Sequence, residues 1–233
     1  MNQIITQHGW CLNSNMWLNL KNKLKKDNLL WQDNERGYFY SKSKNPEWIE
    51  NNNKNNFRMV ICHSLGTQLI NPNILNKASH AVLINSFFNF IPNNNRRNFT
   101  IRVLRKMEKR INSKEIEFLI KEFLFSAFLP NPIEDYLKDM LKIKNKEINL
   151  NLLLNDFKRL YCENLDYRLF SKDCEILIIK SNNDSILEEN SIINLISILN
   201  KIQNKKPKVV ELDQQGHLII GNEILNIIKE WIN

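Results

Sequence analysis

Short apolar runs recur along most of this 233-residue chain, and segments with helical spacing follow them. The apolar runs predict strands at 3–7, 29–32, 57–63, 81–85, 175–180 and 208–212. Helices are predicted at 14–26, 65–70, 188–200 and 221–232, and a short helix is expected to begin at Pro46. A repeat of strand and helix is typical of a mostly parallel sheet with helices on both faces, so we expect an α/β fold.

The pattern changes between Ile91 and about Phe170, where strand-like runs disappear. Long helical stretches take over, with a break near Pro130 and Pro132. We therefore expect 91–170 to form a helical cap inserted between two strands, while 1–90 and 171–233 form the core.

One segment of the expected cap, 115–129, is unusually dense in Phe, Leu and Ile. A helix of this composition must bury most of its circumference. Core packing is the common reason for such density. The alternative is an acyl pocket, for which we single out Phe123 and also Phe87 and Phe88, which follow the strand at 81–85.

The strand at 57–63 runs directly into Cys62-His63-Ser64-Leu65-Gly66, and a helical pattern follows. This order resembles a nucleophile elbow, in which a strand ends in a sharp turn that exposes a serine hydroxyl. The usual motif is G-x-S-x-G, and cysteine stands here at its first position. A five-residue motif with one mismatch is weak unless partner residues are found elsewhere.

Partner residues follow later strands in a suitable order. Asp184 comes soon after the strand at 175–180, and His217 comes soon after the strand at 208–212. A histidine can take the proton of Ser64, and a carboxylate can hold the imidazole in the productive tautomer. Asp184 suits the carboxylate role because catalytic groups in open α/β sheets usually follow strands. Two other acids compete for it, Asp173 and Asp213.

An oxyanion needs two preorganised donors. The backbone N–H groups of Leu65, next after the serine, and of Trp10, in the loop after the first strand, are the expected pair. The positions of the glycines support the same assignment of functional loops, because the chain holds only five glycines. Four of them lie in or just after the motif segments: Gly9, Gly66, Gly216 and Gly221.

Composition excludes several other kinds of chemistry. There is no HExxH, paired Cys, GxxxxGK or GxGxxG motif, so no metal and no cofactor is expected. No uncharged apolar run approaches the roughly 18 residues of a membrane span. A strand predicted almost at the first Met leaves no room for a secretory signal, and the four cysteines show no disulfide pattern, so we expect a cytoplasmic protein with reduced thiols.

The chain carries a formal net charge of +8. Lysine-rich coding bias explains a basic surface, and nucleic acid, an anionic membrane or an acidic protein are the alternative partners. The densest basic segment follows Arg97 and has three- and four-residue steps, which define a cationic stripe on one helix face: Arg102, Arg105, Lys106, Lys109 and Arg110. Phe99, Val103, Met107 and Ile111 occupy another face. The stripe is either a solvated surface or a docking surface for an acidic partner.

His8-Gly9-Trp10, the elbow, Asp184 and Gly216-His217 together resemble the α/β-hydrolase superfamily over nearly the full chain. Within it the chain is most similar to the pimeloyl-acyl carrier protein methyl ester carboxylesterases of biotin synthesis, through the opening His-Gly-Trp with Trp17, the elbow, the segment 31–39 and the compact basic cap. The two antiparallel strands that usually open this fold are expected to be absent. Departures from the family are Cys62 and Thr67, which replace glycines.

The resemblance implies a catalytic triad of Ser64, Asp184 and His217, with Trp10 and Leu65 as oxyanion donors. It further implies that the enzyme removes the methyl group from a pimeloyl chain held on acyl carrier protein. The carrier would contact cap residues Arg97, Arg102, Arg105, Lys106, Lys109 and Arg110. We expect a monomer that binds neither nucleic acid nor a membrane.

Three rival functions use the same fold. A general carboxylesterase would hydrolyse small esters without a carrier protein. A lyase of the menaquinone pathway would use the triad to abstract a proton. A binding protein with vestigial chemistry would not need Ser64.

Overall fold

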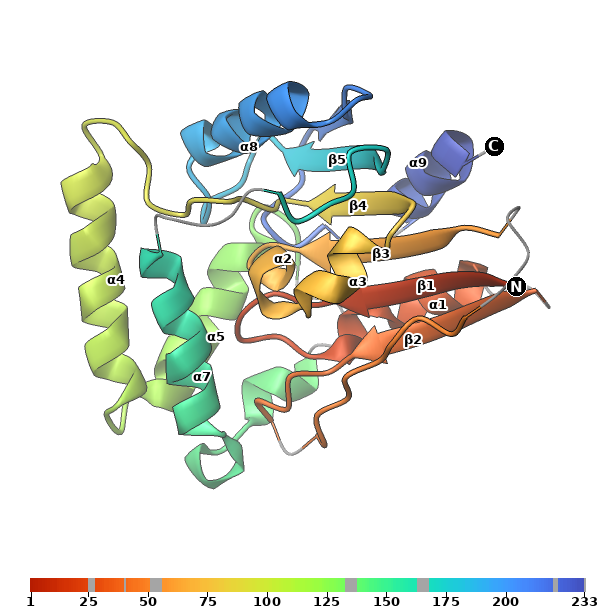
Figure 1. Ribbon diagram of the computed structural model, residues 1–233. Helices are drawn as coiled ribbons and strands as arrows, with labels where there is room; N and C mark the ends of the chain where they lie inside the picture. Colours follow the sequence, from red (N-terminus) through yellow and green to blue (C-terminus); the bar gives the residue numbers. More distant parts are fainter. Residues whose placement is uncertain are drawn as a thin grey trace.

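The computed structural model describes residues 1–24, 28–39, 41–50, 56–132, 138–162, 168–219 and 222–232. Its centre is a six-stranded sheet in the order β2-β1-β3-β4-β5-β6 (Figure 1). The strands are β1 (Asn2–Gln7), β2 (Leu29–Asn34), β3 (Arg58–His63), β4 (His80–Ile84), β5 (Glu175–Ser181) and β6 (Lys208–Leu212). Every pairing between these strands is parallel, which confirms the predicted α/β class; no antiparallel strand precedes β1 in the described chain.

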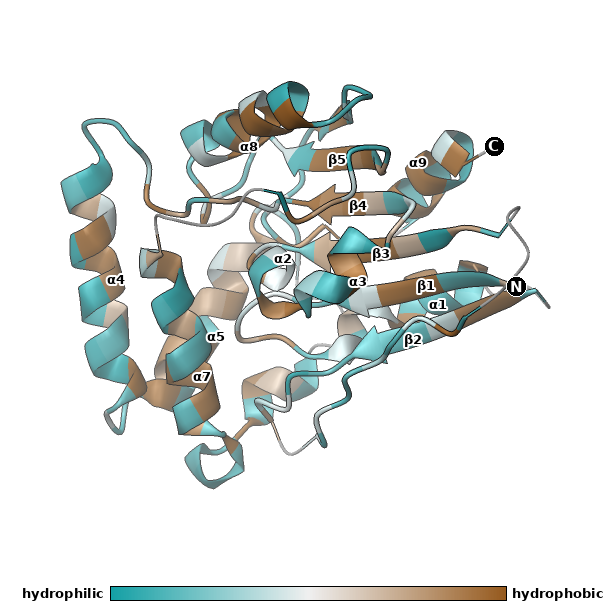
Figure 2. Cartoon of the chain, viewed as in Figure 1, coloured by the Kyte–Doolittle hydropathy of each residue, from teal (hydrophilic) through white to brown (hydrophobic). Residues whose placement is uncertain are grey.

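Alternate residues of the strands pack into two separate cores. Met59 and Ile61 of β3 join one core, whereas Val60 and Cys62 join the other. Both faces of the central strands are therefore buried, and this is why they read as continuous apolar runs rather than as alternating patterns. Figure 2 shows hydrophobic residues along much of β4 and β5.

Helices cover both faces of the sheet. The first core packs on α1 (Leu18–Leu24), which the 3₁₀ helix η1 (Ser14–Trp17) precedes, and on α9 (Asn222–Ile232). The second core packs on α3 (Pro72–Asn76) and α8 (Glu189–Ile202). The short α2 (Gly66–Leu69) follows β3 directly. Of the four glycines that the sequence analysis places in or just after the motif segments, Gly221 lies outside the described residues.

No helix forms at Pro46, where one was predicted. The side-chain amide of Gln3 donates to the backbone oxygen of Ile49 at 2.7 Å and accepts from its N–H at 2.8 Å. The indole Nε1 of Trp48 also donates to the oxygen of Ile74, at 3.0 Å. These bonds hold the segment extended beside β1, so its backbone groups are not free to form a helical turn.

The chain between β4 and β5 contains α4 (Arg97–Ile111), α5 (Ile116–Phe128) and α7 (Leu150–Phe157), with 3₁₀ helices η2 (Asp139–Lys142), η3 (Asn145–Glu147) and η4 (Lys158–Tyr161). In Figure 1 these three α-helices stand together beyond the carboxyl ends of the strands. Helical stretches were expected from Ile91 onward, but 91–96 are irregular and α4 begins only at Arg97. The proposed domain boundaries at 90 and 171 stay a prediction.

Side chains from the loops that follow β1 and β2 hold α7 of the helical segment against the sheet. The guanidinium of Arg36 makes two hydrogen bonds of 2.8 Å to Asp156 of α7, and the hydroxyl of Tyr38 donates to the same carboxylate at 2.7 Å. Trp10 donates from its indole Nε1 to the backbone oxygen of Leu153 at 2.8 Å. Asp156 is 2% exposed, so this ion pair fixes α7 from inside the protein.

Across the ranges that the structure describes, no helix combines the length and the apolar character that crossing a membrane requires.

Candidate active site

The turn after β3 places Ser64 in a strained backbone conformation. β3 ends at His63 and α2 begins at Gly66, so two residues reverse the chain. Ser64 has a φ of +53°, in the left-handed region that residues other than glycine seldom adopt. Its backbone N–H donates to the oxygen of Ile84 at 2.9 Å, which ties the turn to β4. This is the geometry that the elbow motif predicts.

Gly66 is required by the close approach of the loop that follows β1. A Cβ atom at Gly66 would lie 2.7 Å from the backbone oxygen of Gln7 and 3.2 Å from that of His8. No side chain fits at such distances, since the nearest atoms belong to the backbone. Glycine at the fifth position of the motif therefore lets the loop of Trp10 reach the serine.

Cysteine is tolerated at the first position of the motif because its side chain points into the second core. Cys62 is fully buried there, and burial raises the pKa of its thiol well above the ordinary value. A thiol that stays protonated and has no access to solvent is not a nucleophile.

Three side chains from three loops meet beside the elbow. His217 Nε2 lies 2.8 Å from the hydroxyl oxygen of Ser64, and His217 Nδ1 lies 2.7 Å from Oδ2 of Asp184. Asp184 follows β5, and His217 follows β6, so both come from the carboxyl edge of the sheet. The structure thus brings together the serine, histidine and acid that the sequence singled out.

The carboxylate of Asp184 is held in one orientation. Its Oδ1 accepts from the backbone N–H groups of Ile186 and Leu187, each at 2.8 Å, which leaves Oδ2 for His217. Burial opposes ionisation, but the charge and hydrogen bond of His217 and the two backbone donors outweigh it, so the pKa of Asp184 is lowered. The competing acids lie elsewhere: Asp173 and Asp213 are both exposed, paired with Asn204 and Asn182.

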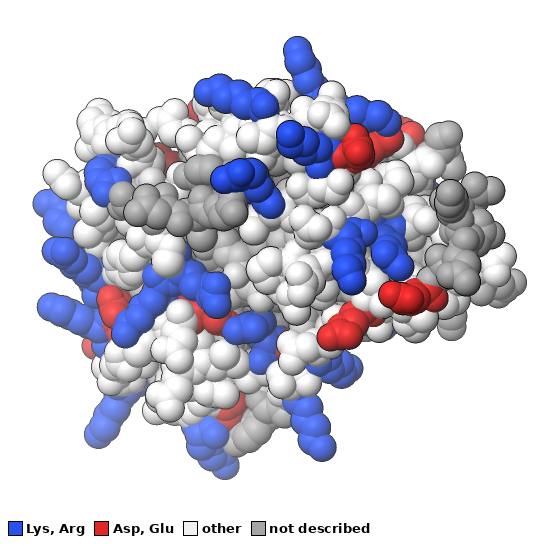
Figure 3. All heavy atoms as spheres, in the orientation of Figure 1, with Lys and Arg blue, Asp and Glu red and all other residues white. Residues whose placement is uncertain are grey.

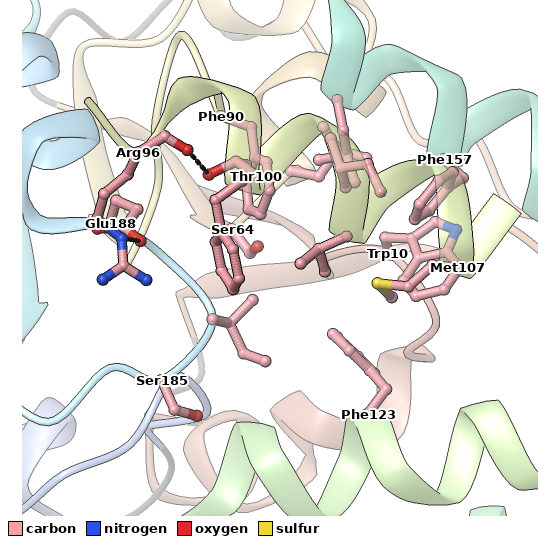
Figure 4. A pocket seen from close by; sticks show the side chains of 16 residues that line it. Trp10, Ser64, Phe90, Arg96, Thr100, Met107, Phe123, Phe157, Ser185 and Glu188 are labelled. Atoms are coloured by element: carbon pink, nitrogen blue, oxygen red, sulfur yellow. Dashed lines mark hydrogen bonds and ion pairs between the residues drawn. The ribbon is translucent and has the colours of Figure 1, made fainter. Parts of the chain in front are cut away.

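Trp10, Ser64 and Leu65 line one cavity of about 200 Å³, and Figure 4 shows Trp10 and Ser64 in it. The positions of Trp10 and Leu65 suit the expected oxyanion donors, a role that stays a prediction. The cavity is mostly apolar, and Trp10 packs against Phe123 and Phe157 with ring centroids 5.2 and 5.1 Å apart. In the described residues, no group of three or more His, Cys, Asp or Glu side chains is arranged to hold a metal ion.

The aromatic wall of the cavity differs in part from the prediction. Phe123 lines it, as expected, but Phe87 and Phe88 do not. Both are completely buried, Phe87 in the first core and Phe88 in the second. The phenylalanine of this loop that lines the cavity is Phe90, whose ring packs against that of Phe87 with centroids 5.2 Å apart. The prediction for Phe87 and Phe88 is therefore corrected.

One face of α4 completes the cavity. Phe99, Val103 and Met107, which the sequence places together, all line it. At one end Arg96 pairs with Glu188, with Nε and Oε1 2.7 Å apart, and Figure 4 shows this pair on the opposite side of Ser64 from Trp10. The cavity therefore combines an apolar body with a charged rim.

The opposite face of α4 carries most of the cationic stripe. Arg102, Arg105, Lys106 and Lys109 are exposed, and Figure 3 shows Lys and Arg side chains projecting from the edge of the molecule where α4 lies. Arg110 does not belong to this exposed stripe. Its side chain is 18% exposed and forms ion pairs with Glu115 and Glu122. Arg97, just before the stripe, is only partly exposed.

No protein-family model and no curated protein matches the sequence. Solved structures match over the whole chain at low identity. The chain is similar to an esterase from Exiguobacterium antarcticum, with a TM-score of 0.70 and 14% identity over 100% of this chain and 91% of that one.

Two further structures agree with it. A hydrolase from Oleispira antarctica matches with a TM-score of 0.70 and 12% identity, over 100% of this chain and 91% of that one. A bromoperoxidase from Bacillus anthracis matches with a TM-score of 0.71 and 14% identity, over 99% of this chain and 90% of that one. Full-length agreement around a parallel six-stranded sheet identifies the fold of this chain as the α/β-hydrolase fold.

Proposed function

We propose that this protein is a serine carboxylesterase. The observation that carries the proposal is the unbroken chain of contacts from Asp184 through His217 to Ser64, at 2.7 and 2.8 Å, in the wall of an apolar cavity. A serine is a weak nucleophile until a base takes its proton, and this arrangement supplies the base and the group that orients it.

The reaction follows from these positions. As the oxygen of Ser64 attacks the ester carbonyl carbon, its proton passes to Nε2 of His217, and Asp184 stabilises the imidazolium. The backbone N–H groups of Trp10 and Leu65 would bind the oxyanion. The imidazolium then protonates the departing alcohol, and an acyl-enzyme remains. Water, deprotonated by His217, releases the acid and restores the serine.

The proposed substrate is the methyl ester of a pimeloyl chain on acyl carrier protein. Support comes from the resemblance in sequence and from the two faces of α4. One face lines the apolar cavity, where an unbranched acyl chain can lie, and the other carries the exposed cationic stripe. An acidic carrier docked on this stripe would therefore be separated from the cavity by the width of α4 alone.

The substrate is tested by incubating the protein with pimeloyl-carrier methyl ester, beside the Ser64→Ala variant, and following the gel mobility of the carrier. We expect demethylation by the wild type only. A small soluble ester is assayed in parallel. Hydrolysis of the small ester without demethylation of the carrier would overturn the carrier substrate while keeping the esterase.

A general esterase is the second candidate, because the similar structures include an esterase and a hydrolase and because the cavity itself needs no carrier. The two functions differ in what the exposed cationic stripe does. We expect reversal of Arg102, Arg105 and Lys109 to glutamate to lower kcat/KM for the carrier-linked ester at least about tenfold, because the attraction between unlike charges is lost. The small ester should be turned over within about twofold of the wild-type rate.

In a matched control, glutamate replaces three exposed lysines in and between α8 and β6: Lys201, Lys206 and Lys208. This variant has the same net charge as the first but leaves α4 unchanged. If both triple variants lose carrier turnover equally, total charge rather than docking on α4 is responsible. Raising the salt concentration should weaken carrier turnover by the two proteins that keep the stripe, the wild type and this control, since salt screens exposed charges.

A further inference from the structure

Two buried side chains converge on the backbone oxygen of His217. Asn85 donates to it from Nδ2 at 2.8 Å, and the ring Nε2 of His63 lies 2.9 Å from it. His63 ends β3, and Asn85 directly follows β4. Both side chains are almost completely buried. The carbonyl of a loop residue is thus held by donors that the two central strands supply.

Asn85 is itself fixed on every side. Its Oδ1 accepts from the backbone N–H of Ser181 at 2.9 Å, and its Nδ2 reaches the oxygen of Gly216 at 3.2 Å as well as that of His217. Its backbone N–H donates to Ile179 at 2.9 Å. The orientation of the amide is therefore determined, with oxygen toward an N–H and nitrogen toward two carbonyls. A φ of +42° is one that asparagine tolerates better than most residues.

Neutral His63 donates to the backbone oxygen of His217 when its ring proton is on Nε2. Burial, followed by the neighbouring charge of His217, lowers the pKa of His63 to about 3. The two imidazole rings lie with centroids 4.9 Å apart. A neutral His63 does not repel the positive charge that His217 acquires during catalysis. The 4.9 Å between the two ring centroids places the imidazole of His63 directly beside that of His217.

We propose that Asn85 and His63 are positioning residues that clamp the backbone of His217 and so aim its imidazole at Ser64. The inference rests on the proposed esterase function, in which His217 is the base. His217 lies in a loop between β6 and α9, outside the sheet ladder, so side-chain donors take the place of ladder hydrogen bonds. A small displacement of a catalytic base lowers turnover strongly, because the reacting atoms must be aligned.

Asn85→Asp is the main test, since it keeps the size of the side chain, its tolerance of positive φ and the acceptor for Ser181. It replaces the donor to His217 by an acceptor. We expect kcat on a small soluble ester to fall about 10- to 100-fold, with KM within about threefold of the wild-type value. Ser86→Ala is the matched control: it removes a buried hydroxyl near the same strand end that bonds to Cys62 and Ile84. Its kcat should stay within about threefold.

A pair of substitutions tests His63. His63→Gln can still donate from its side-chain amide, whereas His63→Leu cannot. We expect His63→Gln to retain kcat within about fivefold and His63→Leu to lose at least about tenfold more. Thermal unfolding of each variant separates a loss of positioning from a loss of folded protein.

A second readout does not depend on turnover. In the Ser64→Ala background, the low-field proton resonance of His217 Nδ1–H reports its hydrogen bond to Asp184, and Asn85→Asp should shift or broaden it. Wild-type kcat in Asn85→Asp, or equal kcat in His63→Gln and His63→Leu, would overturn the clamp. If the wild type shows no turnover that depends on Ser64, the proposed function fails, and an unchanged resonance in Asn85→Asp would then refute the clamp separately.

Discussion

Alanine in place of Ser64 is expected to lower ester turnover at least about 10⁴-fold and to leave the fold intact. The hydroxyl oxygen is the atom that attacks the ester, and it lies 2.8 Å from Nε2 of His217. Alanine fits the same turn, because its side chain is smaller than that of serine. The free-energy cost of a φ of +53° is similar for the two residues. His217→Ala should produce a loss of the same order, since the remaining hydroxyl then has no base.

The measurement is kcat on a small soluble ester, together with covalent labelling by a fluorophosphonate. Wild-type protein should be labelled, and Ser64→Ala should not be. The unfolding temperature of the variant should stay close to that of the wild type. Turnover within about tenfold of wild type would remove Ser64 from the mechanism and favour a function that needs no serine nucleophile.

Most of the sheet and the triad could be predicted because the relevant signals are local. A parallel strand buried on both faces produces a continuous apolar run, and all six runs correspond to strands. The turn at Ser64 needs glycine at a fixed offset, so the elbow is visible as a motif. Asp184 and His217 could be found because each follows a strand. The residues that follow parallel strands lie together at the carboxyl edge of the sheet.

Features that depend on distant residues were not visible in the sequence. The side chain of Gln3 holds Ile49 extended, although 46 positions separate them. The ion pairs of Arg110 with Glu115 and Glu122 depend on how α5 turns back along α4. Helical spacing alone placed Arg110 with its exposed neighbours.

Irregular backbone hides side-chain direction as well. The chain after β4 has no period, so the sequence could not show that Phe90 lines the cavity while Phe87 and Phe88 are buried. The role of Asn85 could not be predicted for a similar reason, since a positive φ at a residue other than glycine produces no recognisable pattern in the sequence. The candidate clamp on His217 was therefore found only from the structure.

Asp184→Asn is expected to lower kcat about 10⁴-fold near neutral pH, although asparagine has almost the same shape. The reason lies in the two backbone donors at Ile186 and Leu187, which hold Oδ1 of the carboxylate. In the variant these donors select the amide oxygen, so the amide nitrogen must face Nδ1 of His217. An N–H pointed at Nδ1 moves the ring proton to Nε2, and His217 then donates to Ser64 instead of accepting its proton.

Asp213→Asn and Asp173→Asn are the matched controls, because both acids were candidates from the sequence and both are exposed. Each should keep kcat within about threefold of the wild-type value. Since the pKa of Asp184 is lowered, the wild-type carboxylate stays ionised through the neutral range and is protonated only as the pH falls below the ordinary range of aspartate. The deficit of Asp184→Asn should therefore persist across neutral pH. A variant that regained wild-type kcat anywhere in that range would show that another group orients His217, and the acid of the triad would have to be sought elsewhere.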